Sequence, residues 1–375
     1  MPPIVILGSS FAALTAVKKL RKSGYKAPLL LIAPRPALFY YPSLIWVPAG
    51  KRTEQSLTLP LENFFNRYNV TYHQATVTGL DPQARLVKTD NDDVAFDSLL
   101  IATGGRFIKK LPGIEHTHLP CSNYADVQTY SERLNDLSGG TLAFGFTANP
   151  NEPAAVRGGP VFEFMFGIDT LLRQQGRRNR FRLVFFNPST SPGQRLGEQA
   201  VTALLAQMAR CGIETHLGHK MKGFAAGKVL TEGGEIESDL TLFMPGLTGP
   251  AWAEASGLPL SSGGFIQANE YCKVNDSEQI YVAGDAGSYP GPDWLPKQAH
   301  IADLQAVAAV KNLLLEKQKK PLKHHFKHEL ICIVDSLNKG MLVYRDDKRV
   351  RLLPPSRMLH WAKVAFEYWY LRSYR

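Results

Sequence analysis

Cysteine can act as a nucleophile, a metal ligand or a redox group, and the chain has four: Cys121, Cys211, Cys272 and Cys332. They are too few and too scattered for the disulfide framework of a small secreted protein. They also lack the C-x-x-C spacing of a zinc or iron–sulfur site, so we expect no metal centre. Any cysteine that matters here is expected to act through thiol redox chemistry. A solvated basic turn, rather than a metal site, is expected for His324, His325 and His328.

Glu163 is a second candidate for chemistry, because it stands between Phe162 and Phe164 in a segment that is predicted to be helical. A carboxyl group among aromatic residues is expected to be partly buried. Burial raises the pKa of such a group towards the range that suits proton transfer. The alternative interpretation is a glutamate that caps the helix or forms a salt bridge.

The first element that could position a site is a predicted strand at residues 4–7, which leads into Gly8 and then into a helical pattern. A strand, a tight turn and a helix in this order outline a dinucleotide-binding unit. The G-x-G-x-x-G pattern is broken, however, because Ser10 and Ala13 replace the second and third glycines. A second predicted strand, residues 28–34, ends without the acidic residue that usually holds a ribose. Taken alone, this segment fits either a nucleotide site or a plain βαβ unit.

Two later strand ends favour the nucleotide site. Residues 98–101 form a predicted strand that leads into A-T-G-G, where small residues let the backbone approach a ligand. Residues 280–283 form another, followed by Gly284, which admits a pyrophosphate, and Asp285, which can accept a hydrogen bond from a ribityl hydroxyl. The helix predicted over residues 296–317 begins beside such a ligand, and its N-terminus favours negative charge.

The order of a Gly-rich turn, A-T-G and G-D resembles the flavoproteins that have two dinucleotide-binding domains. The resemblance implies FAD as the cofactor. It also implies an α/β fold with two Rossmann-like domains of the glutathione reductase type, followed by a C-terminal amphipathic helical region. The residues expected to lie nearest to FAD are Gly8, Ser10, Phe11, Ala12, Pro42, Ala102, Thr103, Gly104, Gly284, Asp285 and Lys297.

The middle of the chain is predicted to be an insertion into the FAD-binding domain. We expect that domain to comprise residues 1–112 and 259–320, with the insertion at 113–258 and a C-terminal region at 321–375. The insertion has the pattern of a second βαβ unit. Its first turn, residues 145–160, lacks G-x-G-x-x-G, so we do not expect a working NAD site there.

Four segments narrow the resemblance further. They are PALFYYPSLIWVPAGKRT, which contains Pro42, Ser43 and Trp46, GGPVFEFMF, HELICIVDSLNKG and PSRMLHWAKVAFEYWYLR. Together they resemble the sulfide:quinone oxidoreductases and flavocytochrome c sulfide dehydrogenases, with type II NADH dehydrogenases as the next relatives. The resemblance covers most of the chain. It implies roles for Glu163 and Cys332, and it places Lys363 beside a quinone headgroup.

In that family two cysteines near the flavin carry sulfur during turnover, and a third assists. The resemblance assigns such roles to Cys121 and Cys332. The remaining family cysteine should precede the G-P-x-x-E-F element by a few residues, where this sequence has Val156-Arg157. If Arg157 lies close to Cys332, we expect it to lower the pKa of that thiol and to activate it. The alternative is that both cysteines are small buried hydrophobic residues, as we expect of the other two.

The net charge of +10 is concentrated at the C-terminus, where residues 317–375 contain 14 Lys and Arg against 5 Asp and Glu. The helix predicted over residues 355–374 interleaves basic side chains with aromatic ones such as Trp361 and Trp369. Such a face suits the headgroup boundary of a membrane. The alternatives are a helix docked on the FAD domain or a dimer contact. A nucleic-acid role is not expected, because no recognised binding module accompanies the charge.

No run of about 18 uncharged apolar residues occurs, so a membrane-spanning helix is not expected. The N-terminus lacks the basic segment and the cleavage site of a signal peptide. We therefore expect a cytoplasmic protein that associates peripherally with the inner face of the plasma membrane.

The sequence thus predicts an FAD-dependent oxidoreductase. We expect it to pass two electrons from sulfide or a related sulfur donor, through an adduct of Cys332 and through FAD, to a membrane quinone. The first rival is an NAD(P)H:quinone oxidoreductase of related fold. A second rival is an inactive scaffold that still binds FAD. Homo-oligomerisation is possible.

Overall fold

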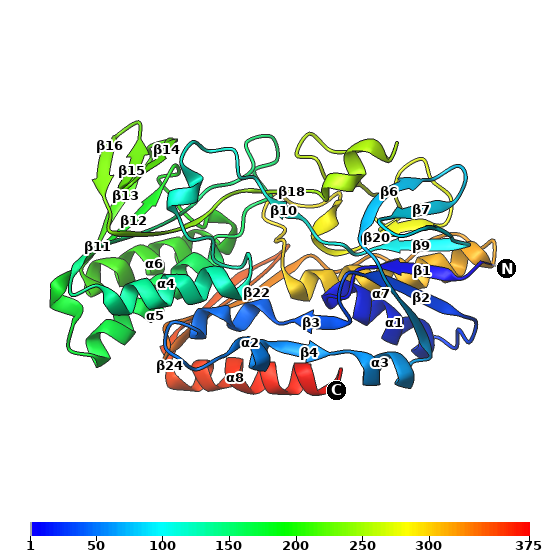
Figure 1. The fold of residues 1–375 in the computed structure, drawn as a ribbon, viewed down its shortest axis with the longest axis horizontal. Coiled ribbons are helices and arrows are strands. Elements are labelled where there is room, and N and C mark those ends of the chain that lie inside the picture. Colours follow the sequence, from blue (N-terminus) through cyan, green and yellow to red (C-terminus); the bar gives the residue numbers. More distant parts are fainter. Residues whose placement is uncertain (1) are drawn as a thin grey trace.

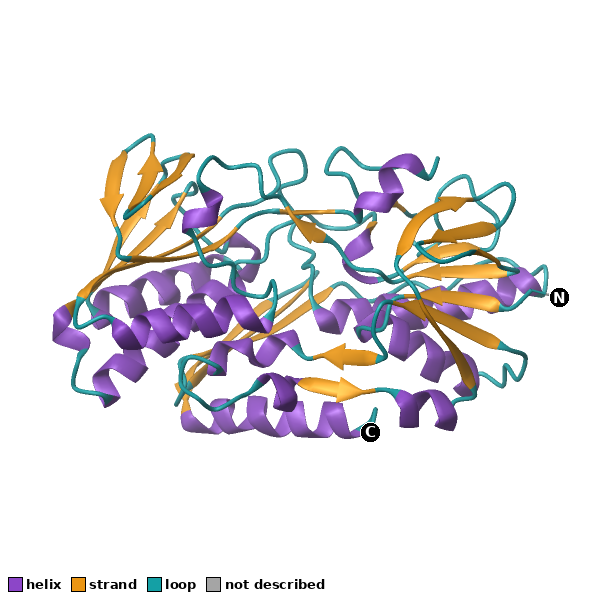
Figure 2. Cartoon of the chain, in the orientation of Figure 1, coloured by secondary structure: helices purple, strands orange, loops and turns teal. Residues whose placement is uncertain are grey.

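The computed structural model describes residues 2–375. Two parallel sheets lie next to each other along the long axis of the molecule, and each has helices on one face (Figure 1). A small antiparallel sheet and the last helix extend along one side, and the secondary structure alternates between helices and strands through most of the chain (Figure 2). The fold is therefore of the α/β class.

The first sheet is parallel throughout and has the order β20-β9-β1-β2-β5. Residues of β1 alternate between two cores, because successive side chains of a strand point to opposite faces. Ile4 and Ile6 pack on the side of helices α1 and α7, and Val5 and Leu7 pack on the side of a three-stranded meander. The elements are β1 (Ile4–Leu7), β2 (Leu29–Ala33), β5 (Val70–Gln74), β9 (Ser98–Ile101), β20 (Ile280–Val282), α1 (Phe11–Lys22), α7 (Ala299–Lys317), β6 (Val77–Asp81), β7 (Leu86–Thr89) and β8 (Asp93–Ala95).

The second sheet is also parallel, with the order β13-β12-β11-β17. Three helices cover one face, and a second meander covers the other, where Ala143, Val184 and Phe243 pack against it. The elements are β11 (Gly140–Phe146), β12 (Phe181–Asn187), β13 (Ile213–Leu217), β17 (Leu240–Met244), α4 (Tyr124–Asp136), α5 (Gly159–Gln174), α6 (Glu198–Cys211), β14 (Met221–Ala225), β15 (Lys228–Thr231) and β16 (Gly234–Glu237).

Two connections link the sheets. Strand β10 (Arg106–Phe107) leaves the first sheet, β18 (Leu247–Thr248) returns from the second, and the two pair antiparallel. Further short elements include β3 (Ala37–Phe39), the 3₁₀ helix η1 (Tyr41–Trp46), α2 (Glu54–Leu57), β4 (Thr58–Pro60), α3 (Glu62–Arg67), β19 (Ile266–Gln267) and β21 (Gly287–Ser288).

The C-terminal region contains a three-stranded antiparallel sheet that the sequence analysis did not predict. It comprises β22 (Glu329–Asp335), β23 (Gly340–Asp346) and β24 (Val350–Ser356), followed by helix α8 (Arg357–Arg372). The predicted helix start at Pro355 is wrong, because Pro354 and Pro355 belong to β24 and Ser356 caps the helix. The Ser356 hydroxyl accepts a hydrogen bond from the Leu359 N–H at 3.3 Å, which satisfies a donor in the first turn.

Candidate functional site

Three strand ends meet at one edge of the first sheet. Leu7 of β1 lies beside Ile101 of β9, which lies beside Val282 of β20. The residues that follow these strands, Gly8, Ala102 and Ala283, are therefore neighbours. Ligands of open α/β sheets bind outside the carboxyl ends of the strands, so this edge is the expected place for a dinucleotide.

Glycine is required at two positions of this edge. Gly8 has φ of +106°, and a Cβ there would stand 2.4 Å from the carbonyl oxygen of Ala102. Gly284 has φ of +78°, and its N–H donates to Gln305 Oε1 at 2.9 Å. An added Cβ at Gly284 would stand 3.3 Å from the Cβ of Ala302 on α7. Both glycines let neighbouring backbone turns lie close together. Gly8 is the one glycine of the G-x-G-x-x-G pattern that this sequence keeps, and it stands at a position where a side chain would clash.

Unpaired polar groups at this edge fit a bound cofactor. Within residues 2–375, the buried Thr103 hydroxyl has no hydrogen-bond partner. Ser10 precedes α1 in an extended conformation, and its hydroxyl makes no capping bond. The first turn of α1, which begins with Phe11 and Ala12, contains no acidic residue, so its N–H groups and positive dipole end are free to face an anion.

Charged residues gather where β20 ends. Asp285 pairs with Arg157, and both side chains are about one-fifth exposed, at 18% and 25%. Lys297 donates to the carbonyl of Gly287 and lies over the ring of Phe265, with its Nζ 3.8 Å from the ring centroid. Burial lowers the pKa of Lys297 to about 8, although the Asp285 carboxylate opposes this shift. A cavity of about 120 Å³ is lined by residues of this group, including Gly284, Asp285 and Lys297.

A buried ion pair joins α8 to α5. The Lys363 ammonium donates to Glu163 Oε1 and, at 3.1 Å, to the carbonyl oxygen of Ile333. Burial raises the pKa of Glu163, and the Lys363 charge and the Asp335 N–H offset part of that shift. Burial alone would lower the pKa of Lys363, but the Glu163 carboxylate, together with Cys332 and Asp335, raises the pKa above its ordinary value. A salt-bridged glutamate was the alternative expectation for this residue, and Glu163 does form a salt bridge while it is buried.

Three further polar residues surround this pair. The Asp335 N–H donates to Glu163 Oε1 at 2.9 Å, and its carboxylate accepts from Trp46 Nε1 at 3.0 Å and contacts His360 Nδ1 at 2.7 Å. The sequence analysis gave no role to Asp335 or His360. Two signals in the sequence could have indicated them. Asp335 ends the apolar run LICIV, and His360 stands three residues before Lys363, a spacing that places His360 and Lys363 on one face of a helix.

The candidate redox cysteines lie near this polar cluster. The charges of Glu163 and Lys363 act on the thiols of both Cys121 and Cys332. The Cys332 sulfur lies close to the start of α5, since a Cβ on Gly159 would be 3.9 Å from it. Cys121 is 7% exposed and has φ of +66°, a strained conformation of the kind that tends to occur at functional sites. Both cysteines are free thiols.

Burial controls the ionisation of both thiols. It raises the pKa of Cys121 to about 11 and that of Cys332 to about 12. Arg157 counteracts the shift at Cys121, but it does not contribute at Cys332. The condition under which Arg157 was expected to lower the pKa of Cys332 is therefore not met, because its guanidinium is directed to Asp285 and its charge acts on the other cysteine. Cys272 is fully buried, and Cys211 ends α6.

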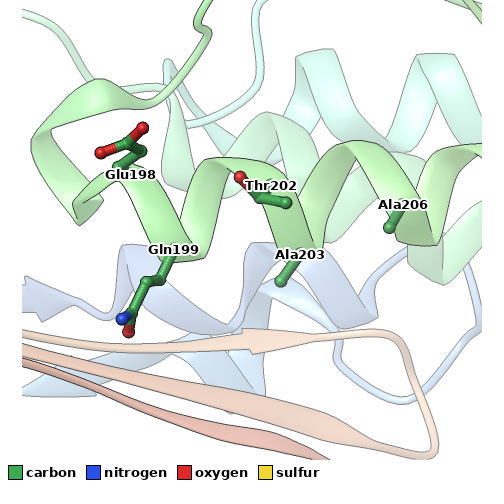
Figure 3. Close-up of a pocket in the computed structure, with 5 residues that line it drawn as sticks. All are labelled: Glu198, Gln199, Thr202, Ala203 and Ala206. Atoms are coloured by element: carbon green, nitrogen blue, oxygen red, sulfur yellow. The ribbon is translucent and has the colours of Figure 1, made fainter.

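A larger hollow of about 450 Å³ lies along α6, away from these residues. Gln199 and Ala203 point from α6 towards strands of the C-terminal sheet (Figure 3). The remaining lining residues are Glu198, Thr202 and Ala206, so the hollow contains one charged group and no residue of the predicted site. In the part of the chain that the structure describes, no group of three or more His, Cys, Asp or Glu residues could hold a metal ion.

The outer face of α8 is rich in exposed apolar side chains. Among residues 2–375, five of the seven exposed large hydrophobic residues belong to this helix: Met358, Trp361, Phe366, Tyr368 and Trp369. The inner face is anchored, because Tyr370 donates to Asp303 of α7 at 2.8 Å and the Thr15 hydroxyl of α1 donates to the same carboxylate at 2.6 Å. None of the helices within residues 2–375 combines the length and apolar character needed to span a bilayer.

Comparison with known proteins identifies the family. The pyridine nucleotide-disulphide oxidoreductase family matches residues 2–306, which is more than half of the chain. The chain belongs to this family. It is thus an FAD-dependent oxidoreductase, and the predictions of the cofactor and of the two Rossmann-like units are confirmed.

Family relatives differ in what they act on. The sulfide-quinone reductase of Aquifex aeolicus is 22% identical over 403 residues, which cover 99% of this chain and 91% of that protein. The nitric oxide reductase FlRd-NAD(+) reductase of Escherichia coli K12 is 28% identical over 321 residues, which cover 83% of this chain and 78% of that protein. The suspected resemblance to sulfide:quinone oxidoreductases is confirmed by the first of these matches.

Solved structures show the same fold. The sulfide:quinone oxidoreductase from Aquifex aeolicus superposes with a TM-score of 0.91 at 20% identity, covering 100% of this chain and 92% of that one. Putidaredoxin reductase in its covalent complex with putidaredoxin has a TM-score of 0.72 at 18% identity, covering 92% of this chain and 82% of that one. The full coverage by the first structure includes the C-terminal sheet and α8, which lie beyond the residues that the family match spans.

Proposed function

We propose that this protein oxidises a reduced inorganic sulfur donor, sulfide or a close relative of it, and passes two electrons to a quinone at a membrane surface. The observation that carries the proposal is the buried Glu163–Lys363 pair, whose charges act on the thiols of both Cys121 and Cys332. This pair connects a thiol site to α8, and the outer face of α8 is apolar and exposed. The similarity to sulfide-quinone reductase along 99% of the chain supports the same assignment.

The residues at the strand ends of the first sheet are proposed to hold the cofactor. Gly8, Thr103 and Gly284 line the edge that the dinucleotide would occupy, and Lys297 supplies positive charge there. When bound, FAD accepts two electrons from the sulfur donor and releases them to the quinone.

Cys332 is proposed to bind the sulfur atom of the donor. A thiol and a hydrosulfide anion combine to a persulfide with loss of one proton and two electrons, and bound FAD would be the electron acceptor. The new S–S bond replaces the S–H bond of the thiol, and the S–H bond of the hydrosulfide is kept in the persulfide. Because burial raises the pKa of Cys332 to about 12, this residue is a protonated thiol at pH 7, and the thiol must lose its proton in the step. Glu163 lies near both thiols, and its raised pKa suits it to accept the released proton.

Cys121 is proposed as the partner thiol that receives the sulfur from Cys332 by attack on the persulfide. Such an exchange forms one S–S bond while it breaks another and needs no further oxidant. Arg157 favours the thiolate of Cys121, which is the form that attacks. On this proposal, Arg157 replaces an assisting family cysteine by activating one of the two cysteines that the chain retains.

Anaerobic stopped-flow absorbance of the FAD-bound protein tests the proposal. Sulfide should bleach the flavin rapidly in the wild type, and a short-chain quinone should then restore the colour. Cys332→Ser should abolish the bleaching, and Cys121→Ser should slow it. Cys211→Ser is the matched control, because Cys211 lies at the end of α6 outside the cluster, and it should leave the rate unchanged. Bleaching that survives in the Cys332 variant would refute the assigned role.

A second candidate function is electron transfer from NAD(P)H, which the match to an NAD(+) reductase favours. The geometry of the second sheet argues against it. A Cβ on Gly158, just before α5, would stand 2.5 Å from the ring of Phe146, so this aromatic ring covers the helix start where a dinucleotide pyrophosphate would bind. Mixing the same protein with NADH separates the two functions. Fast bleaching by NADH, with none by sulfide, would favour the second, and silence with both donors would favour an inactive FAD-binding scaffold.

A further inference from the structure

A buried aspartate–histidine pair lies next to the Glu163–Lys363 ion pair. His360 Nδ1 is 2.7 Å from Asp335 Oδ2, and the Asp335 side chain is completely buried. The other carboxylate oxygen of Asp335 accepts hydrogen bonds from Trp46 Nε1 at 3.0 Å and from the Leu337 N–H at 2.8 Å. An oxygen pair that accepts this many hydrogen bonds belongs to an ionised carboxylate, so the proton of the pair resides on His360 Nδ1.

The second nitrogen of His360 is left available for chemistry. Within residues 2–375, Nε2 makes no hydrogen bond, and this atom is not fully buried. The imidazole ring packs edge-on against Trp46, with centroids 6.0 Å apart, and against Trp361, with centroids 5.5 Å apart. Trp361 is 65% exposed on the outer face of α8. His360 therefore lies between the buried acid–base cluster and the exposed helix face.

The neighbouring charges single out Asp335. Asp335 faces His360 from β22, Glu163 belongs to α5, and Glu367 lies on the same helix as His360. The cations of the cluster are Lys363, which pairs with Glu163, Arg52, which pairs with Glu367 at 2.9 Å, and Lys51, which donates to the carbonyl of Leu337 at 3.2 Å. Of the three carboxylates, Asp335 alone forms no salt bridge to a lysine or arginine among residues 2–375, and His360 is its partner. Buried charges need a partner, so the Asp335 carboxylate depends on the His360 ring.

We propose that His360 donates one of the two protons that a quinone takes up when it is reduced, and that Asp335 positions His360 for this transfer. The inference rests on the proposed function. Reduction of a quinone to a quinol consumes two electrons and two protons, and each oxygen of the quinone gains one O–H bond. The electrons come from the reduced flavin, one proton comes from the Lys363 ammonium and the other from Nε2 of the His360 imidazolium. Both residues are then reprotonated from solvent at the membrane surface.

The pair holds the ring in one orientation. A carboxylate on Nδ1 fixes the tautomer and stabilises the imidazolium, which leaves Nε2 as the donor. His360 and Lys363 are three residues apart on α8, so their side chains lie on the same face, and Glu163 links them through the Asp335 N–H at 2.9 Å. Two proton donors on one helix face suit a ligand that must be protonated at two oxygens.

Separate half-reactions test the inference. We expect His360→Gln to slow quinone-driven reoxidation of the flavin by about 10²–10⁴-fold, the usual contribution of general acid catalysis, and to abolish the pH dependence of that step. Bleaching by sulfide should change less than about twofold in the same protein, which also shows that the variant is folded and loaded with FAD. His116→Asn is the matched control, since His116 is exposed and lies far along the chain from α8, and it should behave as the wild type in both half-reactions.

Asp335→Asn provides a test that does not depend on turnover. In ¹⁵N-histidine NMR spectra of the wild type, Nδ1 of His360 should carry a proton in both the charged and the neutral form of the ring, and the neutral ring of the variant should show a mixture of tautomers. Its reoxidation rate should fall less than that of His360→Gln. Wild-type rate and pH dependence in His360→Gln would overturn the inference while the proposed function stands. A wild-type protein that sulfide bleaches but no quinone reoxidises would overturn the proposed electron acceptor, and this inference with it.

Discussion

Replacement of the two exposed tryptophans of α8 should release the protein from membranes. Trp361 and Trp369 are 65% and 66% exposed. A Trp side chain buries roughly 150–250 Å², so the two exposed portions together offer about 300 Å². At about 25 cal/mol per Å², complete burial would contribute about 7 kcal/mol, and half of it, for rings that settle at the headgroup level, about 4 kcal/mol. The double variant Trp361→Ser, Trp369→Ser should therefore bind vesicles about 10³-fold more weakly, since each 1.4 kcal/mol is tenfold.

The assay is co-sedimentation with vesicles of phosphatidylcholine and phosphatidylglycerol at several salt concentrations. Binding of the wild type should weaken as salt rises, because the basic residues of the C-terminal region meet anionic headgroups. The folding free energy of the double variant should change by less than about 0.5 kcal/mol, as expected for surface substitutions. Equal vesicle binding by the variant and the wild type would refute the membrane assignment of this face. Deletion from Pro355 onward is a poor substitute, because it also removes Lys363 and the Tyr370 anchor to Asp303.

Three further predictions concern the rest of the site. Gly8→Ala should lose FAD, measured by flavin absorbance per protein, because its Cβ would stand 2.4 Å from a backbone carbonyl; Gly167→Ala, with open space around its Cβ, should keep the cofactor. Burial lowers the pKa of Lys297 to about 8, so between pH 8 and 10.5 the unfolded chain holds a proton that the folded chain has released. The stability of the FAD-free protein in denaturant should thus rise with pH across this window, more steeply than in Lys297→Met, and parallel slopes would contradict the assignment. The pKa values of Cys121 and Cys332 are about 11 and about 12, so both thiols should react with iodoacetamide slowly at pH 8 and faster towards pH 11. Peptide mass spectrometry measures the labelling. Fast labelling at pH 8 would show that a thiolate is already present.

The strand ends that are proposed to hold FAD could be located from the sequence because they follow strands that are short, apolar and bounded by small residues. Gly8, Thr103 and Gly284 each stand at such a strand end. Parallel strands bring their carboxyl ends to one edge, so local pattern and three-dimensional position coincide. The start of α8 was mispredicted for the opposite reason. Two prolines interrupt the alternation of apolar and polar residues that would indicate a strand. The pairing of β24 with β23 decides the conformation instead.

The cluster around Asp335 could not be predicted in the same way. Asp335 ends a strand, His360 lies on a helix, and Trp46 lies about 290 positions before Asp335 in the chain, yet the side chains of Trp46 and His360 both form hydrogen bonds with that of Asp335. No spacing rule connects them, because the contact depends on how the C-terminal sheet packs against α5 and α8. The role expected of Arg157 failed for the same reason, since sequence position gave its neighbourhood but not the direction of its side chain.

The sequence by itself determined the fold class, the strand ends that are proposed to hold FAD and the aromatic, basic character of the last helix. These properties follow from periodicity and from small residues at strand ends, which act over a few positions. The tertiary structure decided which charges meet. It buried Glu163 against Lys363 and directed Arg157 to Asp285 and away from Cys332. It also placed Cys121 in a core and Cys332, partly buried, against that core, and this burial raises the pKa of both thiols. Ionisation depends on burial and on partners that are distant in the chain, and these exist after the sheets and helices have packed.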